Sequence, residues 1–546
     1  MKKKYVRWTL WTIASPFILF VILCILIYLP PIQNFLVDKA AVYASEATGM
    51  NISVGRISLS FPLNLVVTDV DAASPHNDTL LSVRRLQVNV QLLPLLKKQV
   101  EVDGISLQGA TVNSNDLIHG MKLNGTLGEL FISSHGVALD PETAIVNKVL
   151  LKDTDLSLCL NDTAAVDTAA SDTTYWKIIL QDIDLQNVSF ALDMPLDSLS
   201  LAASLDNAIL RDGLIDLHKS AYSLQTFRIK NGRVRYDSGK PLAADSLPSG
   251  LDPSHIALTD IGVKLDSLYY EGRNMKAIIS QFVLKERSGV EIVSATGRMV
   301  SNDKVLRVPS LKLETRDSYL ELNAAMDWNA LDFKGEGLVS ARLMADIGKP
   351  DVVRFMGRMD EKFVRQYPSE PLRIRTGIDG DLNKLKLTTL TAELPGALGL
   401  FARGELTHLT DSLLRGGDIT LEAETKDLKF VSTLAEGIEI PYGTRLEGKF
   451  TMAGAKMGTD LLLMQPEAQA VAAADTIPIT VYNDSISVAD DFKMERAARL
   501  FAKYDLSRDR YEADLAVNHF DLHQFMPADS LYTLSTRLKV EGEGFD

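Results

Sequence analysis

The chain of 546 residues carries 57 lysines and arginines against 71 aspartates and glutamates, a net charge of −14. This acidic balance argues against nucleic acid as a partner and against docking on anionic lipid headgroups. The two cysteines, Cys24 and Cys159, exclude a disulfide-stapled scaffold, because Cys24 falls inside the long apolar run near the N-terminus.

The first predicted element is a transmembrane helix over residues 8–29, which contain no charged side chain. The run is 22 residues long, and about 20 apolar residues cross a ~30 Å hydrocarbon core. Basic residues ahead of it predict that residues 1–7 form a cytosolic stub. The cytoplasmic positive residues are Lys2, Lys3, Lys4 and Arg7, and the expected anchor residues are Trp8, Trp11, Phe17 and Tyr28.

A cleaved signal peptide is the alternative to this anchor. Its apolar region is typically 7–15 residues long and ends at a small-residue cleavage site. Here the run is longer and is followed by Pro30-Pro31. We therefore expect an uncleaved single-pass anchor, with the N-terminus in the cytoplasm and everything after residue 30 on the far side of the membrane.

Residues 30–50 are expected to form a short amphipathic helix. Apolar side chains recur at helical spacing from Ile32 to Ala47, and Gly49 is a plausible C-cap. The opposite face is mixed rather than basic, which favours a packing helix over one that lies on a membrane surface.

From residue 51 to residue 546 the apolar period changes to two, as in Leu86, Val88, Val90 and Leu92. That alternation is typical of half-buried strands, so we predict a mainly β region with a few capping helices. Loops are expected near residues 161–174, 238–253 and 465–475, and helical interruptions around residues 349–367 and 488–504.

A weak repeat runs through this region, with the pattern apolar, polar, Gly/Asp/Asn, any, polar, apolar. Its copies begin at Leu107, Leu151, Leu185 and Ile229, 34 to 44 residues apart. The third position suits a turn or bulge, since Gly, Asn and Asp accept left-handed backbone geometry.

No nucleotide-binding, zinc-protease or serine-hydrolase motif appears. Residues 518–523 alternate like a strand, which would hold His519 and His523 about 13 Å apart and disfavours a metal site. The sequence from Asp379 to Asn383 lacks the Gly and Glu that close a calcium loop, so a hairpin turn is favoured. We expect no catalytic residue, no metal, no cofactor and no enzymatic activity.

One triplet recurs: Asp, then Ser or Thr, then an apolar residue or Thr. It begins at Asp78, Asp162, Asp167, Asp172, Asp197, Asp245, Asp266, Asp411, Asp475, Asp484 and Asp529. Asp-Ser and Asp-Thr are turn formers that often precede strands. The triplet also resembles an O-glycosylation acceptor used in the periplasm of some Gram-negative bacteria, and both readings stay open.

The order of elements resembles the AsmA/TamB superfamily, in particular the TamB branch of translocation and assembly modules. The resemblance covers residues 30–113. It rests on residues 32–36, 52–59, 65–70, 86–90, 92–96 and 102–107. TamB proteins are much longer and end in a characteristic β domain, so this chain is expected to be the N-terminal portion of a longer protein.

The resemblance implies an elongated repeating β-sheet groove, an open β-taco, that is apolar inside and polar outside. It also implies a protein that is anchored in the inner membrane with its bulk in the periplasm. The implied activity is passage of phospholipid along this groove in support of outer-membrane biogenesis. An Omp85-type outer-membrane barrel, TamA-like, would be the partner of a C-terminal region absent here. The alternative is a non-enzymatic scaffold for outer-membrane proteins that carries no lipid.

Residues with inward apolar phase are the expected lining of the groove. They are Ile57, Leu59, Phe61, Leu86, Val88, Val90, Leu107, Val112, Leu156 and Leu158.

Overall fold

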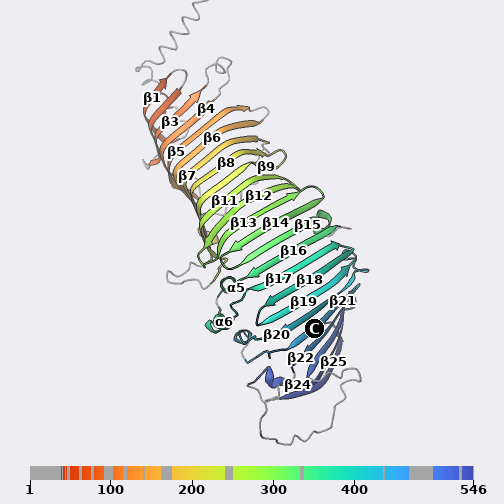
Figure 1. The fold of residues 1–546 in the computed structure, drawn as a ribbon. Coiled ribbons are helices and arrows are strands. Elements are labelled where there is room, and N and C mark those ends of the chain that lie inside the picture. The colour runs from red at the N-terminus through yellow and green to blue at the C-terminus, as the bar shows by residue number, and fades with distance from the viewer. Residues whose placement is uncertain are drawn as a thin grey trace, which may run out of the picture. The chain divides into compact units, whose positions relative to one another are not determined.

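The computed structural model describes residues 39, 41–42, 45, 49–60, 64–74, 79–90, 102–114, 120–138, 142–161, 175–239, 250–332, 337–357, 359–434, 437–466, 496–527 and 532–544. In this part the chain is mainly β, with 25 strands and a few short helices (Figure 1). The expectation of a mainly β fold is therefore confirmed. Among the same residues, no helix combines the length and the apolar character needed to span a membrane.

The predicted anchor and its flanking basic residues lie outside the described residues, as does Phe61. Within the predicted amphipathic helix of residues 30–50, the described residues Lys39, Ala41, Val42 and Ser45 are helical, whereas Gly49 and Met50 lie in a turn and a bend.

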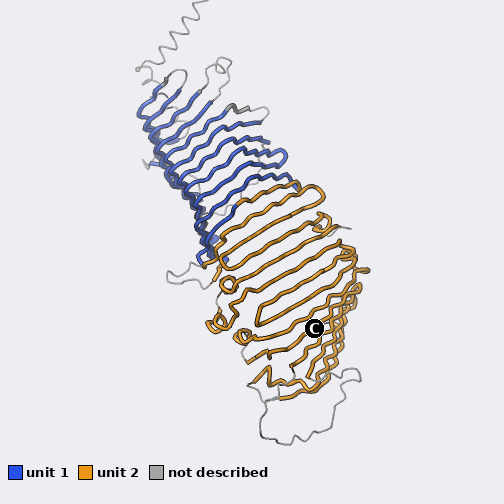
Figure 2. Tube along the Cα trace, in the orientation of Figure 1, with its two compact units in different colours: residues 1–246, 253–272, 281–287 blue, residues 247–252, 273–280, 288–546 orange. Residues whose placement is uncertain are grey.

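The chain divides into two compact units (Figure 2). Unit 1 comprises residues 1–246, 253–272 and 281–287, and unit 2 comprises residues 247–252, 273–280 and 288–546. The strands of unit 1 are β1 (Asn51–Ser60), β2 (Asn64–Ala73), β3 (Thr79–Val90), β4 (Val102–Asn113), β5 (Met121–Ala138), β6 (Thr143–Leu160), β7 (Lys177–Met194), β8 (Leu199–Asp216), β9 (Ala221–Leu224), β10 (Thr226–Ser238) and β11 (His255–Glu271), with the 3-10 turn η1 (Pro195–Asp197) between β7 and β8. Residues of β12 (Asn274–Glu286) belong partly to each unit.

Each strand of unit 1 pairs with its neighbour in the chain, and the pairs are antiparallel apart from β6 and β7, which run parallel. Strands β9 and β10 are the exception to this neighbour pairing. They lie end to end between β8 and β11, and each of them pairs with both of those strands.

Unit 2 continues as an antiparallel series. Its strands are β13 (Glu291–Ser301), β14 (Val305–Thr315), β15 (Tyr319–Asp327), β16 (Leu338–Ile347), β17 (Leu372–Asp381), β18 (Lys384–Leu394), β19 (Leu398–Thr407), β20 (Gly416–Thr425), β21 (Arg445–Ala453), β22 (Lys456–Met464), β23 (Ala497–Asp505), β24 (Arg510–Asp521) and β25 (Thr533–Glu543). Its helices are α4 (Trp328–Leu331), α5 (Lys349–Met356) and α6 (Glu361–Gln366), with 3-10 turns η2 (Val431–Thr433) and η3 (Leu522–Gln524).

The helical interruption predicted at residues 349–367 is confirmed by α5 and α6. The second, at residues 488–504, is wrong where the structure describes it, because residues 497–505 form strand β23. Leu500 pairs with Leu461 on β22 and with Leu515 on β24, while Arg499 forms an ion pair of 2.6 Å with Asp460. Apolar and charged side chains thus alternate with the period of a strand. Pairing with β22 and β24 makes residues 497–505 a strand rather than a helix.

Two smaller expectations concern turns. Asp381 Oδ1 accepts hydrogen bonds of 2.8 Å from the backbone N–H groups of Asn383 and Lys384, which confirms the hairpin turn between β17 and β18. The predicted strand at residues 518–523 ends at Asp521, where the turn η3 begins.

Three of the Asp-Ser/Thr triplets lie wholly in the described residues. Ser198 and Ser412 are exposed in turns, as expected of turn formers. Ser267 is buried within β11, so the expectation of a turn is wrong at Asp266.

The third position of the repeat has the predicted backbone conformation in all four copies. The φ angles are 62° at Gly109, 49° at Asp153, 52° at Asn187 and 54° at Asn231. Each residue lies inside a strand rather than at its end. Left-handed geometry is disfavoured for most L-residues, which explains why Gly, Asp and Asn occupy these positions.

The left-handed residue changes the phase of the side-chain alternation. On β6, Lys152 and Asp155 are both exposed although they are three residues apart, and Thr154 between them is only 2 % exposed. The apolar residues shift in the same way, from Val149 and Leu151 to Leu156. A regular strand would turn its apolar side chains to the other face after such a shift. The left-handed residue therefore keeps one face apolar along the whole strand.

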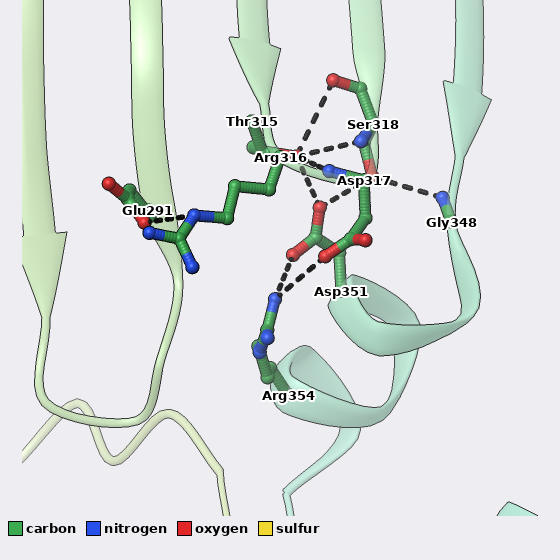
Figure 3. Close-up of polar contacts among 8 residues, drawn as sticks. All are labelled: Glu291, Thr315, Arg316, Asp317, Ser318, Gly348, Asp351 and Arg354. Carbon is green, nitrogen blue, oxygen red and sulfur yellow. Dashed lines mark hydrogen bonds and ion pairs between the residues drawn. The ribbon is translucent and has the colours of Figure 1, made fainter.

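In unit 2 a buried carboxylate holds α5 against the turn between β14 and β15 (Figure 3). Asp351 is 1 % exposed and accepts hydrogen bonds from the hydroxyl groups of Thr315 and Ser318. Arg354 Nη1 lies 3.0 Å from Asp351 Oδ1 and 3.1 Å from Asp317 Oδ2. A buried charge paired and hydrogen-bonded in this way is costly to disrupt.

We expect Asp351→Ala to lower the stability of the α5 region by about 3 kcal/mol, because Arg354 and two hydroxyl groups lose their shared acceptor. Hydrogen exchange of peptides from α5 and from the β14–β15 turn measures this loss. Asp317→Ala is the matched control and should have a smaller effect, since its carboxylate is partly exposed. Equal exchange rates in the two variants would contradict the assignment.

The left-handed position on β7 gives a second prediction. Asn187→Val should destabilise unit 1 by roughly 1–2 kcal/mol, because a β-branched residue resists positive φ. Asn187→Gly should cost less, although both variants lose the hydrogen bond of 2.9 Å from Asn187 Nδ2 to Asp153 Oδ1. Hydrogen exchange of β7 peptides, measured as a function of urea concentration, gives the difference in stability. A larger loss of stability in the glycine variant than in the valine variant would refute the backbone explanation.

Candidate apolar binding face

A row of apolar side chains crosses ten strands of unit 1 at directly opposed positions. We call it the Leu107 row, and it consists of Ile57, Val67, Leu86, Leu107, Leu130, Leu151, Leu185, Ala208, Ile229 and Val263. Opposed side chains on one face of a sheet lie about 4.5–5.5 Å apart between their Cβ atoms, so the row is continuous.

A second apolar row lies beyond the left-handed residues. This Val112 row consists of Ile52, Ala72, Leu81, Val112, Gly125, Leu156, Phe190, Ala203, Val234 and Leu258. Because the alternation changes phase between the two rows, both belong to the same face of the sheet.

Between them lies a crease row next to the left-handed positions. Its members are Val54, Val70, Val83, Ala110, Leu127, Thr154, Val188, Leu205, Gly232 and Ile261. Val83, Ala110, Thr154 and Ile261 are all buried. Eight of the ten residues in this row are small or β-branched, and the exceptions are Leu127 and Leu205.

The structure brings most of the predicted lining residues onto this face. Ile57, Leu86 and Leu107 belong to the Leu107 row, and Val112 and Leu156 belong to the Val112 row. Val88 is opposed by Leu65 and Ile105, and Leu158 by Leu123 and Leu192. Leu59 and Val90 lie in β1 and β3, but their side chains fall outside the described ones, as does all of Phe61.

Sequence reasoning missed several members of the face, among them Leu130, Leu151 and Leu185. Their strands carry apolar residues in both phases, which hides the face in a simple alternation pattern. The signal that could have found them is the odd spacing of five residues between the apolar ends of the repeat.

The face is not closed over by a packed core. Leu81 and Ile105 are each 36 % exposed and Phe190 is 38 % exposed. Clusters of buried apolar side chains occur in unit 2, and the described residues of unit 1 contain none. An apolar surface of this extent is typical of a binding site.

Unit 2 has an apolar row of its own. It consists of Ala295, Leu313, Leu320, Ala345, Ile374, Ala392, Leu400, Ala423, Leu446, Leu463, Ala498 and Val517, from β13 to β24. At one edge, α6 packs Phe363 against Phe430 with ring centres 5.7 Å apart, in a buried cluster with Tyr367 and Leu394. Burial raises the pKa of the Tyr367 hydroxyl.

The opposite face is polar and charged. Asp182 pairs with Arg211 on the next strand, and Asp206 Oδ1 lies 3.7 Å from Arg233. In unit 2 the Arg499 guanidinium donates to Asp460 and lowers the pKa of that carboxyl. These exposed pairs contribute little stability individually, so their main effect is to make this face hydrophilic.

The described residues hold no group of three or more His, Cys, Asp or Glu side chains that could bind a metal ion. His519 contacts Asn518, whereas the ring of His523 lies 5.0 Å from that of Tyr532. The candidate site is thus an extended apolar surface rather than a reactive cluster. Neither a scan against protein-family models nor a search of curated proteins found a match to this chain.

Proposed function

We propose that this protein conducts phospholipids, with their acyl chains lying on the apolar face of its β-sheet. The observation that carries the proposal is the continuity of the Leu107 row across ten strands, from β1 to β11. Nine steps of about 4.8 Å between strands give an apolar path of roughly 43 Å.

The energetics favour acyl chains as the occupant. Burial of one CH₂ group contributes about 0.8 kcal/mol, so a chain that covers several strands gains substantial binding energy. Leucine, isoleucine and valine recur from strand to strand, and the gain is therefore similar at successive positions. A lipid can then move along the row, because no single position binds it much more tightly than the next.

The finer features of the proposal rest on the sequence. They are an open groove of the β-taco kind, an anchor in the inner membrane, and a role in outer-membrane biogenesis with an Omp85-type barrel as partner. The uncharged run at residues 8–29 and the resemblance of residues 30–113 to the TamB branch support them.

A scaffold for outer-membrane proteins is the second candidate. The same apolar face, half-exposed at Leu81 and Phe190, could hold an apolar polypeptide segment instead of lipid. The two functions differ in occupant, and purification separates them. Phospholipid that copurifies with the chain supports conduction, and its absence favours the scaffold.

Photo-crosslinking tests which face holds the lipid. A photoreactive residue at Val88 or Leu107 should capture phospholipid in membranes, because both belong to the apolar face. Gln87 is the matched control, since its side chain hydrogen-bonds to Asn89 on the polar face at 3.0 Å. Mass spectrometry of the adducts reads the result, and labelling at Gln87 equal to that at Val88 would exclude the apolar face.

A charge placed in the row should interrupt transfer. We expect Leu151→Glu to reduce copurified phospholipid several-fold, because an unpaired carboxylate is costly on an apolar surface. Lys152→Glu is the control, with a side chain exposed on the opposite face of the same strand. Circular dichroism establishes that both variants fold, and unchanged lipid content in folded Leu151→Glu would contradict conduction along this row.

A further inference from the structure

A hollow of about 730 Å³ lies in unit 1, and its lining includes Ile229 and Val263 of the Leu107 row as well as Ile209 and Val283. It is formed by strands β8, β10 and β11 and by the residues of β12 that belong to unit 1. Gly262 is one of its lining residues, and a Cβ atom added there would meet Val283 Cγ2 at 2.8 Å. The volume is in the range of small-ligand sites.

Three basic side chains line this hollow: Arg228, Lys230 and Lys264. Arg228 on β10 is directly opposed to Lys264 on β11. Directly opposed like charges destabilise a strand pair. By contrast, Asp182 in the same unit is opposed by Lys148 on one side and by Arg211 on the other.

Among the residues that line the hollow, one is acidic and three are basic. Asp260 also lines it, but its carboxylate is 2.8 Å from Lys285 Nζ, which already compensates its charge. Asp266 lies 3.6 Å from Lys264 Nζ, and both side chains are partly exposed, so their attraction is weak. Arg228 and Lys230 are exposed. The hollow is thus locally positive in a chain whose net charge is −14.

Neutral donors complete the lining. Gln281 is exposed at the hollow, and Asn207 and Asn231 lie beside the basic residues. Asn207 already donates to Asp184 at 3.2 Å, and Asn231 to Asp206. These two bonds hold the amides in place and leave the donors of Arg228, Lys230 and Gln281 for a ligand.

We infer that this hollow binds a phosphate-bearing anion. Three clustered cations fit a group with several charged oxygens better than a single carboxylate, and Arg and Lys are the side chains that bind phosphate. The anion would compensate the repulsion between Arg228 and Lys264. Its source is either a phospholipid headgroup or a soluble phosphate compound. The inference goes beyond lipid conduction, since it concerns an anion held by basic side chains and not acyl chains held by the apolar rows.

Calorimetric titration of the full chain with inorganic phosphate, against sodium chloride at equal ionic strength, tests the site. We expect saturable binding that Arg228→Gln and Lys264→Gln each weaken about tenfold, through loss of a charge-assisted hydrogen bond. Lys219→Gln is the matched control: it removes the same charge from an exposed turn of unit 1 and should leave binding unchanged.

Thermal unfolding provides a second measurement. Without phosphate, Lys264→Gln should be at least as stable as the unmodified chain, because the repulsion between Arg228 and Lys264 is gone. Phosphate should stabilise the unmodified chain but not Lys264→Gln.

Competition by dihexanoyl phosphatidylglycerol, but not by dihexanoyl phosphatidylcholine, would identify a lipid headgroup as the source. Phosphate binding without competition from either lipid would identify a soluble phosphate compound. Equal phosphate binding by the unmodified chain and all three variants, or none by any, overturns the inference.

Discussion

The main constraint behind unit 1 is the left-handed residue next to the crease row in six of its strands, β2, β4, β6, β7, β10 and β11. Strands such as β6 span 18 residues, and an uninterrupted alternation with the chain's apolar spacing would place apolar side chains on both faces. One residue at positive φ resets the phase without breaking the series of pairs. The Leu107 row, the crease row and the Val112 row share a face because the partner strands shift phase as well. On β3, for example, the rows contain Leu86 and Val83, three residues apart, although no residue between them has a positive φ.

Stability and function then make different demands on the same sheet. Each strand contacts mainly its two neighbours, so stability accumulates strand by strand as in repeat proteins. Where a denser core does occur, around Phe363 and Phe430, it lies in unit 2 and contains no member of the apolar row from Ala295 to Val517. In a sheet of this kind each added strand contributes further apolar surface, so the apolar area of the sheet grows in proportion to the number of strands.

Local chemistry made much of this fold predictable, and long-range pairing did not. The repeat predicted positive φ at Gly109 and Asn231, because few residue types accept that geometry. The helical pattern at residues 488–504 misled, because the faces of residues 497–505 are decided by β22 and β24. The lining around Leu107 was predicted, but its neighbour Leu130 lies outside the repeat, and its place in the row depends on the register between β4 and β5. Likewise, Arg228 and Lys264 are 36 positions apart in the sequence, and no local pattern predicts that they lie opposite each other on β10 and β11.

The parallel pairing of β6 with β7 has a consequence for the spacing of the repeat. Antiparallel neighbours alternate in direction, so β2, β4 and β6 run one way, and the parallel step adds β7 and then β10 to the same set. The four copies of the repeat lie on β4, β6, β7 and β10. Their spacing is therefore 44 residues where a returning strand intervenes, and 34 where none does. The motif is a marker of chain polarity, from which the direction of each strand can be read along the sequence.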